Sequence, residues 1–199
     1  MPNVDATKIH QGPGKLWLSV SVPASGSRLL INAAGDPTGG TPIFAGATEG
    51  AATVLLSPKL ETISADQVAA PIDVVMTAEG ASVEVTLKES DLAKLKNFIA
   101  NGAFSSGTDT GLPAGAQAYE EISFGGTLAI PKTSVAVISP RRDAASKFVV
   151  SQLYQAYQAE AIQLPFQRGK ETTYKVKFEA LADPSRAAGD QVGKIYRQT

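Results

Sequence analysis

Hydrophobic and polar residues alternate with a period of two along several short segments of the chain. This alternation is typical of β-strands with one buried face. It is found in residues 16–22, 72–76, 81–87, 119–124, 135–138 and 174–180, and RLLI at residues 28–31 is a further short strand candidate. In LWLSVSV, residues 16–22, the leucines and valines at even positions share one face and Trp17 lies on the other. Trp17 is therefore expected either under a second layer or in a subunit contact.

Residues 71–88, PIDVVMTAEGASVEVTLK, predict a β-hairpin. Its turn is expected at Glu79-Gly80, because glycine supplies the positive φ that tight turns need. Apolar residues at alternate positions from 81 to 87 would face the core, and the residues between them would face away. A cluster at Phe148, Val149 and Val150 favours a further strand.

A short helix is expected to follow the hairpin. Ser90 or Asp91 can accept hydrogen bonds from the first free amides, and Asn101-Gly102 can end the helix by adopting the left-handed conformation. These limits predict about ten helical residues. The apolar stripe that would lie on the sheet consists of Leu92, Leu95, Phe98 and Ile99.

Segments rich in glycine, serine, threonine and proline predict loops between the strands. They are residues 32–42 and 103–118, together with an arm at 1–15 and a tail at 183–199. Residues 43–64 contain Gly46, Gly50 and Pro58, which are expected to divide this stretch into short strands.

The count of strands against a single helix sets the fold class. Eight or more strands predict an all-β sandwich or barrel with one flanking α-helix, long loops and extended terminal arms. A chain of 199 residues is long enough for one such domain, and we expect residues 1–199 to form it.

Composition narrows the classes of function. Eighteen lysines and arginines against 19 aspartates and glutamates give a net charge of -1, which disfavours binding to nucleic acid or to an anionic membrane by overall charge. The chain has no cysteine, and we find no signal peptide and no apolar run of membrane-spanning length. These features predict a soluble protein made in the cytoplasm.

The residues present give no recognisable catalytic constellation. His10 is the one histidine, and it lies in the arm, where a general base would be poorly held. GPGKLW, residues 12–17, lacks the remaining residues of a phosphate-binding loop. Glu120 and Glu121 are adjacent on a strand and would point to opposite faces, so they cannot act as an acid/base pair. We therefore expect no enzyme activity, no cofactor and no metal.

Two basic residues leave alternatives open. Arg141 and Arg142 could bind a phosphate or carboxylate, lie in a solvated turn, or form an intersubunit ion pair. Long arms, neutral loops and strands with unpaired edges are features of a subunit that completes itself on its neighbours.

Three stretches resemble the tail tube (major tail) proteins of long-tailed bacteriophages. They are IHQGPGKLWLSVSVPASGSRLLI, IFAGATEGAATVLLSPKLETISADQVAAPIDVVMTAEGASVEVTLKE and TTYKVKFEALADPSRAAGDQVGKIYRQ. The shared features are the Gly-Pro-Gly arm, GATEGA, a D-x-x-x-x-P-I/V motif before a sheet, the helix after it, and a late strand ending in F-x-A-L-A-D. The likeness covers most of the chain in order.

The resemblance implies a β-sandwich or barrel that forms hexameric rings, which stack into a hollow tube for DNA. The partners would be further copies of the chain and other tail proteins, namely tape measure, tail tip or baseplate, and terminator. DNA would only pass through, without sequence-specific binding, and the protein would lie in the virion tail after assembly in the host bacterial cytoplasm. Residues expected to face the lumen are Glu84, Thr86, Lys175, Lys177 and Glu179. Family lumens tend to be acidic, and the two lysines depart from that pattern.

Contacts between subunits and rings are expected from the arm, the loops at 32–42 and 103–118, and the tail. The individual candidates are His10, Gly12, Pro13, Gly14, Trp17, Asp36, Pro37, Arg141 and Arg142. Alternative functions are another virion protein, such as a tail terminator, a head-tail connector or a capsid decoration protein, or an immunoglobulin-like binding module.

Overall fold

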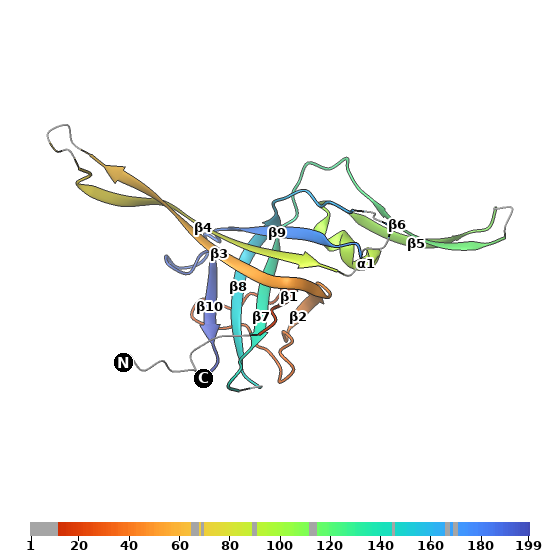
Figure 1. The fold of residues 1–199 in the computed structure, drawn as a ribbon, viewed down its shortest axis with the longest axis horizontal. Coiled ribbons are helices and arrows are strands. Elements are labelled where there is room, and N and C mark those ends of the chain that lie inside the picture. Colours follow the sequence, from red (N-terminus) through yellow and green to blue (C-terminus); the bar gives the residue numbers. More distant parts are fainter. Residues whose placement is uncertain are drawn as a thin grey trace.

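A computed structural model describes residues 12–64, 68, 70–88, 91–111, 115–144, 146–165, 168 and 171–199. These residues form ten β-strands, one α-helical turn and one 3-10 turn (Figure 1). The strands are β1 (Lys15–Val20), β2 (Gly40–Phe44), β3 (Thr48–Ile63), β4 (Asp73–Leu87), β5 (Ala103–Asp109), β6 (Gln117–Ser123), β7 (Thr133–Pro140), β8 (Phe148–Gln158), β9 (Tyr174–Leu181) and β10 (Gly193–Arg197). The helical turns are α1 (Leu92–Leu95) and η2 (Lys96–Phe98). The predicted all-β fold with one helix is confirmed.

The main sheet is antiparallel and has the strand order β2-β1-β7-β8-β9-β4-β3. It forks at β8, where one edge pairs with β7 and the other pairs with two strands. Residues 149–153 of that second edge pair with β10, and residues 155–158 pair with β9. Because of the fork, β9, β4 and β3 lie across the sheet formed by β1, β7 and β8 (Figure 1).

The main hydrophobic core lies between these two parts of the sheet. The helical turns add Leu95 and Phe98, and the Phe98 ring lies 6.1 Å from the rings of both Tyr174 and Phe178. The strand residues of this core are Leu16, Leu18, Ala81, Val83, Val85, Leu87, Val135, Val137, Leu153, Ala156, Tyr174, Val176 and Phe178. The alternations predicted for residues 81–87 and 174–180 are therefore correct.

The alternation predicted for residues 16–22 fails after Leu18. Ser19 has a φ of +53°, and the register of β1 against β2 shifts between Leu18 and Val20. This bulge turns Val20 to the opposite face, where it joins a second hydrophobic cluster together with Trp17. Val22 is exposed and lies beyond β1. The buried residues of the second cluster are Val20, Leu29, Ala136, Ile138, Phe148 and Val150.

Residues 28–38 form a loop over this second cluster rather than the strand expected at 28–31. Within it only Ile31 and Pro37 form an isolated β-bridge. Leu29 is buried, and the Tyr196 hydroxyl of β10 donates to the Leu29 carbonyl. Gly35 lies against Phe148, so the loop and β10 together cover the outer face of β7 and β8.

Gly35→Ala is expected to destabilise the fold by about 2–5 kcal/mol. A Cβ on Gly35 would lie 2.5 Å from the Phe148 ring, and the residue has a φ of +83°. Overpacking costs about 1–3 kcal/mol, and the left-handed conformation adds roughly 1–2 kcal/mol. Gly26→Ala is the matched control, because Gly26 also has a φ of +83° but no heavy atom within 4 Å of the added Cβ. Thermal unfolding should separate the two variants; equal midpoints would contradict the close packing at Phe148.

The turn predicted at Glu79-Gly80 is wrong. β4 runs straight through both residues, with Glu79 opposite Pro58 and Gly80 opposite Ser57. Glycine is favoured here by close approach, because a Cβ on Gly80 would lie 2.9 Å from the Ser57 hydroxyl. The actual hairpin joins β3 to β4, and its strands project from the body of the subunit (Figure 1).

β3 is one continuous strand, although Gly50 and Pro58 were expected to break it. Its register shifts between Glu49 and Thr53, around Gly50 with a φ of +73°. β3 pairs only with β4 among the described strands, and an edge strand accepts a proline because its outer side needs no ladder hydrogen bond.

Three other expectations about connecting segments also need correction. Residues 103–118 are not a loop, because β5 and β6 pair in register from Ala103–Ser123 to Asp109–Gln117 and form a second hairpin. The helix is shorter than ten residues, although Asp91 caps it by accepting from the amide of Ala93 at 2.9 Å. The tail at 183–199 contains β10, which is part of the main sheet.

Candidate interaction surfaces

The β3–β4 hairpin projects from the body of the subunit (Figure 1). The side of its strands that faces the core near the body continues along the projecting part. Along this side the cross-strand pairs run from Val54–Val83 and Leu56–Ala81 to Leu60–Met76. Val83 and Ala81 are buried in the core, whereas Leu56, Leu60 and Met76 are exposed. The apolar side of the sheet therefore continues beyond the point where the second layer covers it.

The opposite side of the same hairpin is mixed, since Lys59, Glu61 and Asp73 alternate there with apolar residues. Leu55, Ile63 and Val75 are exposed there, and Val74 is exposed on the core-facing side. Large exposed apolar surfaces on soluble proteins usually mark interaction sites. The hairpin thus presents apolar side chains on both faces, which one subunit does not cover within its described residues.

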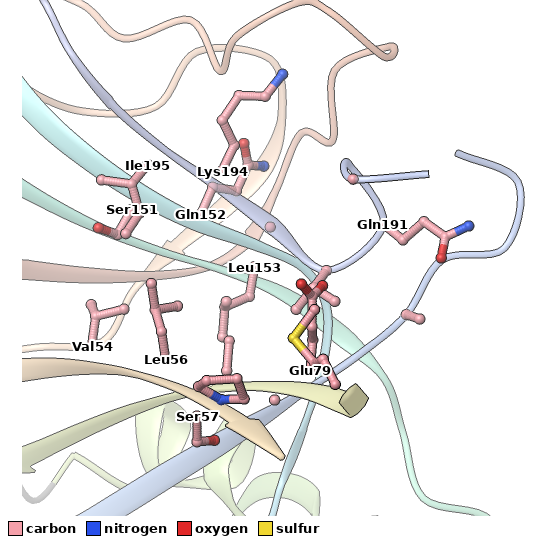
Figure 2. A pocket seen from close by; sticks show the side chains of 18 residues that line it. Val54, Leu56, Ser57, Glu79, Ser151, Gln152, Leu153, Gln191, Lys194 and Ile195 are labelled. Carbon is pink, nitrogen blue, oxygen red and sulfur yellow. The ribbon is translucent and has the colours of Figure 1, made fainter. Parts of the chain in front are cut away.

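A groove lies at the base of the hairpin (Figure 2). It has a volume of about 770 Å³ and is bounded by β3 and β4 on one side and by β8, β10 and residues 189–192 on the other. Figure 2 shows Val54 and Leu56 of β3 pointing toward Leu153 of β8. Glu79 and Lys194 are the charged residues of its lining. The groove is therefore mainly apolar, with one charge of each sign.

A network of polar side chains holds one wall of the groove in place. Asp190 accepts hydrogen bonds from the hydroxyls of Tyr154 at 2.6 Å and Ser25 at 2.9 Å, and pairs with Arg186 at 3.0 Å. The Arg186 guanidinium also lies 3.8 Å from the centre of the Tyr154 ring and donates to the Pro23 carbonyl. These contacts fix residues 182–192 against the loop that follows β1.

The pKa of Asp190 is lowered below its usual value of 3.8, chiefly by the Tyr154 hydroxyl, with further contributions from Ser25 and Arg186. Burial and the same hydrogen bond raise the pKa of Tyr154 to about 12. A lowered carboxyl pKa gives stability that is complete above the unfolded-state pKa and is lost as the pH falls toward the folded-state pKa.

We therefore expect acid to weaken this network. Between about pH 6 and about pH 3 the thermal midpoint of the wild type should fall more than that of Asp190→Asn, because the variant has no carboxylate there to protonate. Thermal unfolding followed by circular dichroism at each pH measures the difference. Parallel pH profiles for the two proteins would count against the role of Asp190.

A charged surface covers the face of β4 and β9 that points away from the core. The register pairs Glu84 with Lys177, Thr86 with Lys175, and Ser82 with Glu179. The structure thus brings all five residues predicted to face the lumen onto one side of two neighbouring strands. The Lys175 ammonium lies 3.1 Å from Glu84, and the Lys177 ammonium lies 3.2 Å from Glu179.

Neighbouring residues that the sequence did not single out extend this surface. Glu160 pairs with Lys177 at 3.4 Å, and Lys88 pairs with Glu171 at 2.8 Å and with Glu49 at 3.8 Å. The Tyr157 hydroxyl donates to Glu179, and this bond together with Lys177 lowers the pKa of the Glu179 carboxyl. The alternation of residues 84, 86 and 88 could have identified Lys88. Glu160 follows β8 and Glu171 precedes β9, so no strand pattern marks either residue.

This charged surface is acidic overall, since the glutamates outnumber the lysines. The residues that form its ion pairs are Glu49, Glu84, Lys88, Glu160, Glu171, Lys175, Lys177 and Glu179. Exposed ion pairs of this kind contribute about 0–1 kcal/mol each to stability. Their main effect is to neutralise the lysines and leave a hydrophilic surface with excess negative charge.

The Gly-Pro-Gly motif lies over β7 of its own chain. A Cβ on Gly12 would lie 2.9 Å from the Pro140 carbonyl, and one on Gly14 would lie 3.0 Å from Val137. Both glycines therefore serve a close approach within the subunit, while Pro13 is exposed. His10 lies outside the described residues.

The other predicted contact residues are largely engaged within the chain. Trp17 is half-buried and its ring centre lies 5.2 Å from that of Phe44. Pro37 is buried and offers no surface to a neighbour, and Asp36 pairs with Lys15 at 3.5 Å.

Arg141 and Arg142 differ in their surroundings. Arg141 forms an ion pair with Asp143 and donates to the Gln198 carbonyl, so it ties the end of the chain to the turn after β7. Its partner Asp143 has a lowered pKa, chiefly because of the Arg141 hydrogen bond. Arg142 is exposed.

The described residues also bear on metal binding and membrane spanning. Among them, no group of three or more histidine, cysteine, aspartate or glutamate side chains could hold a metal ion. The same residues include no helix that is long and apolar enough to cross a membrane.

No protein-family model matches the chain, and no curated protein matches it.

Proposed function

We propose that the protein is a structural subunit that assembles into stacked hexameric rings and forms the tail tube of a bacteriophage. The observation that carries the proposal is the β3–β4 hairpin, whose core-facing side continues out of the body with Leu56, Leu60 and Met76 exposed. An apolar strand face of this kind needs a covering layer, and another copy of the chain can supply it.

The free energy gained by burying the apolar side chains of the hairpin supports assembly in which neighbouring copies cover several surfaces of each subunit. Full burial of one large apolar side chain contributes about 1.5–3 kcal/mol. Association costs roughly 4–15 kcal/mol in lost translational and rotational freedom. The hairpin offers Leu55, Leu56, Leu60, Ile63, Val74, Val75 and Met76. Such a set can offset the association cost if neighbouring copies bury most of it.

The charged surface of β4 and β9 supports the assignment of an inner wall. In a ring, each copy would place its excess of glutamates on the channel, and a phosphate backbone would be repelled rather than bound. The lysines at 175 and 177 remain compatible with this, because each pairs with a glutamate. DNA would therefore pass through the tube without sequence-specific binding.

The resemblance to tail tube proteins supplies the rest of the proposal. It provides the six subunits per ring, the position in the virion tail, and the partners at the ends and inside of the tube. The subunit is not an enzyme in this proposal, and it needs no cofactor.

Sedimentation velocity over a series of protein concentrations tests the proposal. A tube subunit should pass from monomers to large, fast-sedimenting species over a narrow concentration range. A single small ring that never grows would replace the tube by another virion ring protein, such as a terminator or connector. A monomer at every concentration would oppose self-assembly altogether.

A further inference from the structure

The segment after β6 presents apolar side chains to solvent. Phe124, Leu128 and Ile130 are exposed, and Leu128 has an exposed fraction of 101%. Residues 124–131, FGGTLAIP, contain no charged residue. We call residues 124–130 the apolar segment.

The apolar segment has unused backbone hydrogen-bonding groups. Among the described residues it belongs to no strand and makes no backbone–backbone hydrogen bond. The Asn101 side chain donates to the carbonyls of Thr127 at 3.2 Å and Ala129 at 2.6 Å. Asn101 itself has a φ of +58° at the end of the helical turns. The segment is thus held in place at its carbonyls while its amides stay available.

The groove at the base of the β3–β4 hairpin has complementary properties. Its lining is mainly apolar and nearly neutral in charge. Gly193, Lys194 and Ile195 of β10 border it, and in the described part of the chain β10 pairs only with β8. The outer edge of β10 is therefore open to an added strand.

The apolar segment does not line the groove of its own subunit. Its two ends are fixed by β6 and β7, and Ile130 borders Gln158 at the last residue of β8. The groove borders Ser151 and Leu153 further back along the same strand. A meeting between the two therefore requires two copies of the chain.

We propose that the apolar segment of one copy adds as a strand along the open edge of β10 in the next copy. Its amides pair with the β10 backbone, and its apolar side chains enter the groove. Segment and groove are different surfaces of the same chain, so the contact is head-to-tail and repeats from copy to copy. The inference rests on the proposed function, since both require association of copies.

Disulfide trapping tests the contact, because the wild-type chain contains no cysteine. Leu128→Cys is combined in turn with Leu56→Cys, Met76→Cys and Ile195→Cys, whose parent residues line the groove. A disulfide forms only where the two Cα atoms come within about 7 Å. Mild oxidation of the assembled protein should give a ladder of dimers, trimers and larger species for at least one pair. Each single variant should give dimers at most.

The matched control combines Leu128→Cys with Leu30→Cys, since Leu30 is 71% exposed and does not line the groove. This pair should give no ladder. Leu128→Asp should raise the protein concentration needed for assembly at least 10-fold, with an unchanged thermal midpoint because the side chain is fully exposed.

The outcomes separate the inference from the function on which it rests. Assembly of the three trapping variants without any ladder would overturn the docking of the apolar segment and leave the tube intact. A ladder that the Leu30 control also gives would overturn it as well. A wild-type protein that never assembles would overturn both.

Discussion

Replacing Leu60 and Met76 together with aspartate is expected to abolish assembly while the subunit stays folded. The two residues are cross-strand partners on the hairpin, with exposed fractions of 62% and 54%. In the free subunit the new carboxylates remain in water, so the fold should lose little stability. In an interface they would be buried without partners, at a cost of several kcal/mol.

That cost should raise the protein concentration needed for assembly more than about 100-fold, since 1.4 kcal/mol corresponds to a factor of ten. Sedimentation velocity measures the shift, and thermal unfolding checks the fold. Leu30→Asp is the control for an aspartate at an exposed apolar position, because Leu30 is 71% exposed and lies outside the hairpin; it adds one of the two charges that the double variant carries. Assembly of the double variant at wild-type concentrations would contradict the role of the hairpin.

Val85→Asp is expected to prevent folding. Val85 is 2% exposed and lies in the main core, opposite Val176 on β9. An aspartate there would lie among the apolar side chains of the main core, and leaving a charge unpaired in a core costs more than about 4–5 kcal/mol. This loss is comparable to the whole stability of many domains.

The adjacent position supplies the control for this variant. Thr86→Asp introduces the same charge one residue further along β4, on the charged surface opposite Lys175. It should change the free energy of unfolding by about 1 kcal/mol or less, as surface substitutions usually do. Circular dichroism should show a cooperative transition for Thr86→Asp and none for Val85→Asp. A wild-type midpoint for Val85→Asp would contradict the burial of this face.

The alternation of residues was sufficient to predict the strands whose one face lies in the core. In β9 from Tyr174 to Phe178 and in the second half of β4, every second residue is buried, so period two identifies both the strand and its polar side. For the same reason the charged surface could be predicted: Glu84 and Lys177 had to face away from Val83 and Phe178. Which strands become neighbours was not available from this pattern.

The sequence was insufficient to predict the structure at glycines, because a glycine can have either of two physical causes. Gly80 was interpreted as a turn, but a glycine also allows close approach, and only the pairing with Ser57 distinguishes the two. Gly107 is a second case, because a Cβ there would lie 2.7 Å from the hydroxyl of Tyr119 across the β5–β6 hairpin. Glycine-rich composition therefore concealed a pair of strands.

Neither the exposed face of the hairpin nor the groove could be predicted from the sequence, and the reason differs between the two. Alternation at residues 72–76 indicates a face that needs cover, and it is the same whether the cover comes from this chain or from another copy. The groove is assembled from residues near 56, 80, 152 and 193, which are far apart in sequence. No local pattern marks such a site.

Negative-stain electron microscopy of the purified wild-type protein, at concentrations below and above the onset of fast sedimentation, tests the central claim most directly. The account predicts stacked annular particles or hollow filaments above the onset, and their absence in the Leu60→Asp/Met76→Asp variant. Monomers at the highest attainable concentration, or solid aggregates without a channel, would contradict a tube-forming subunit.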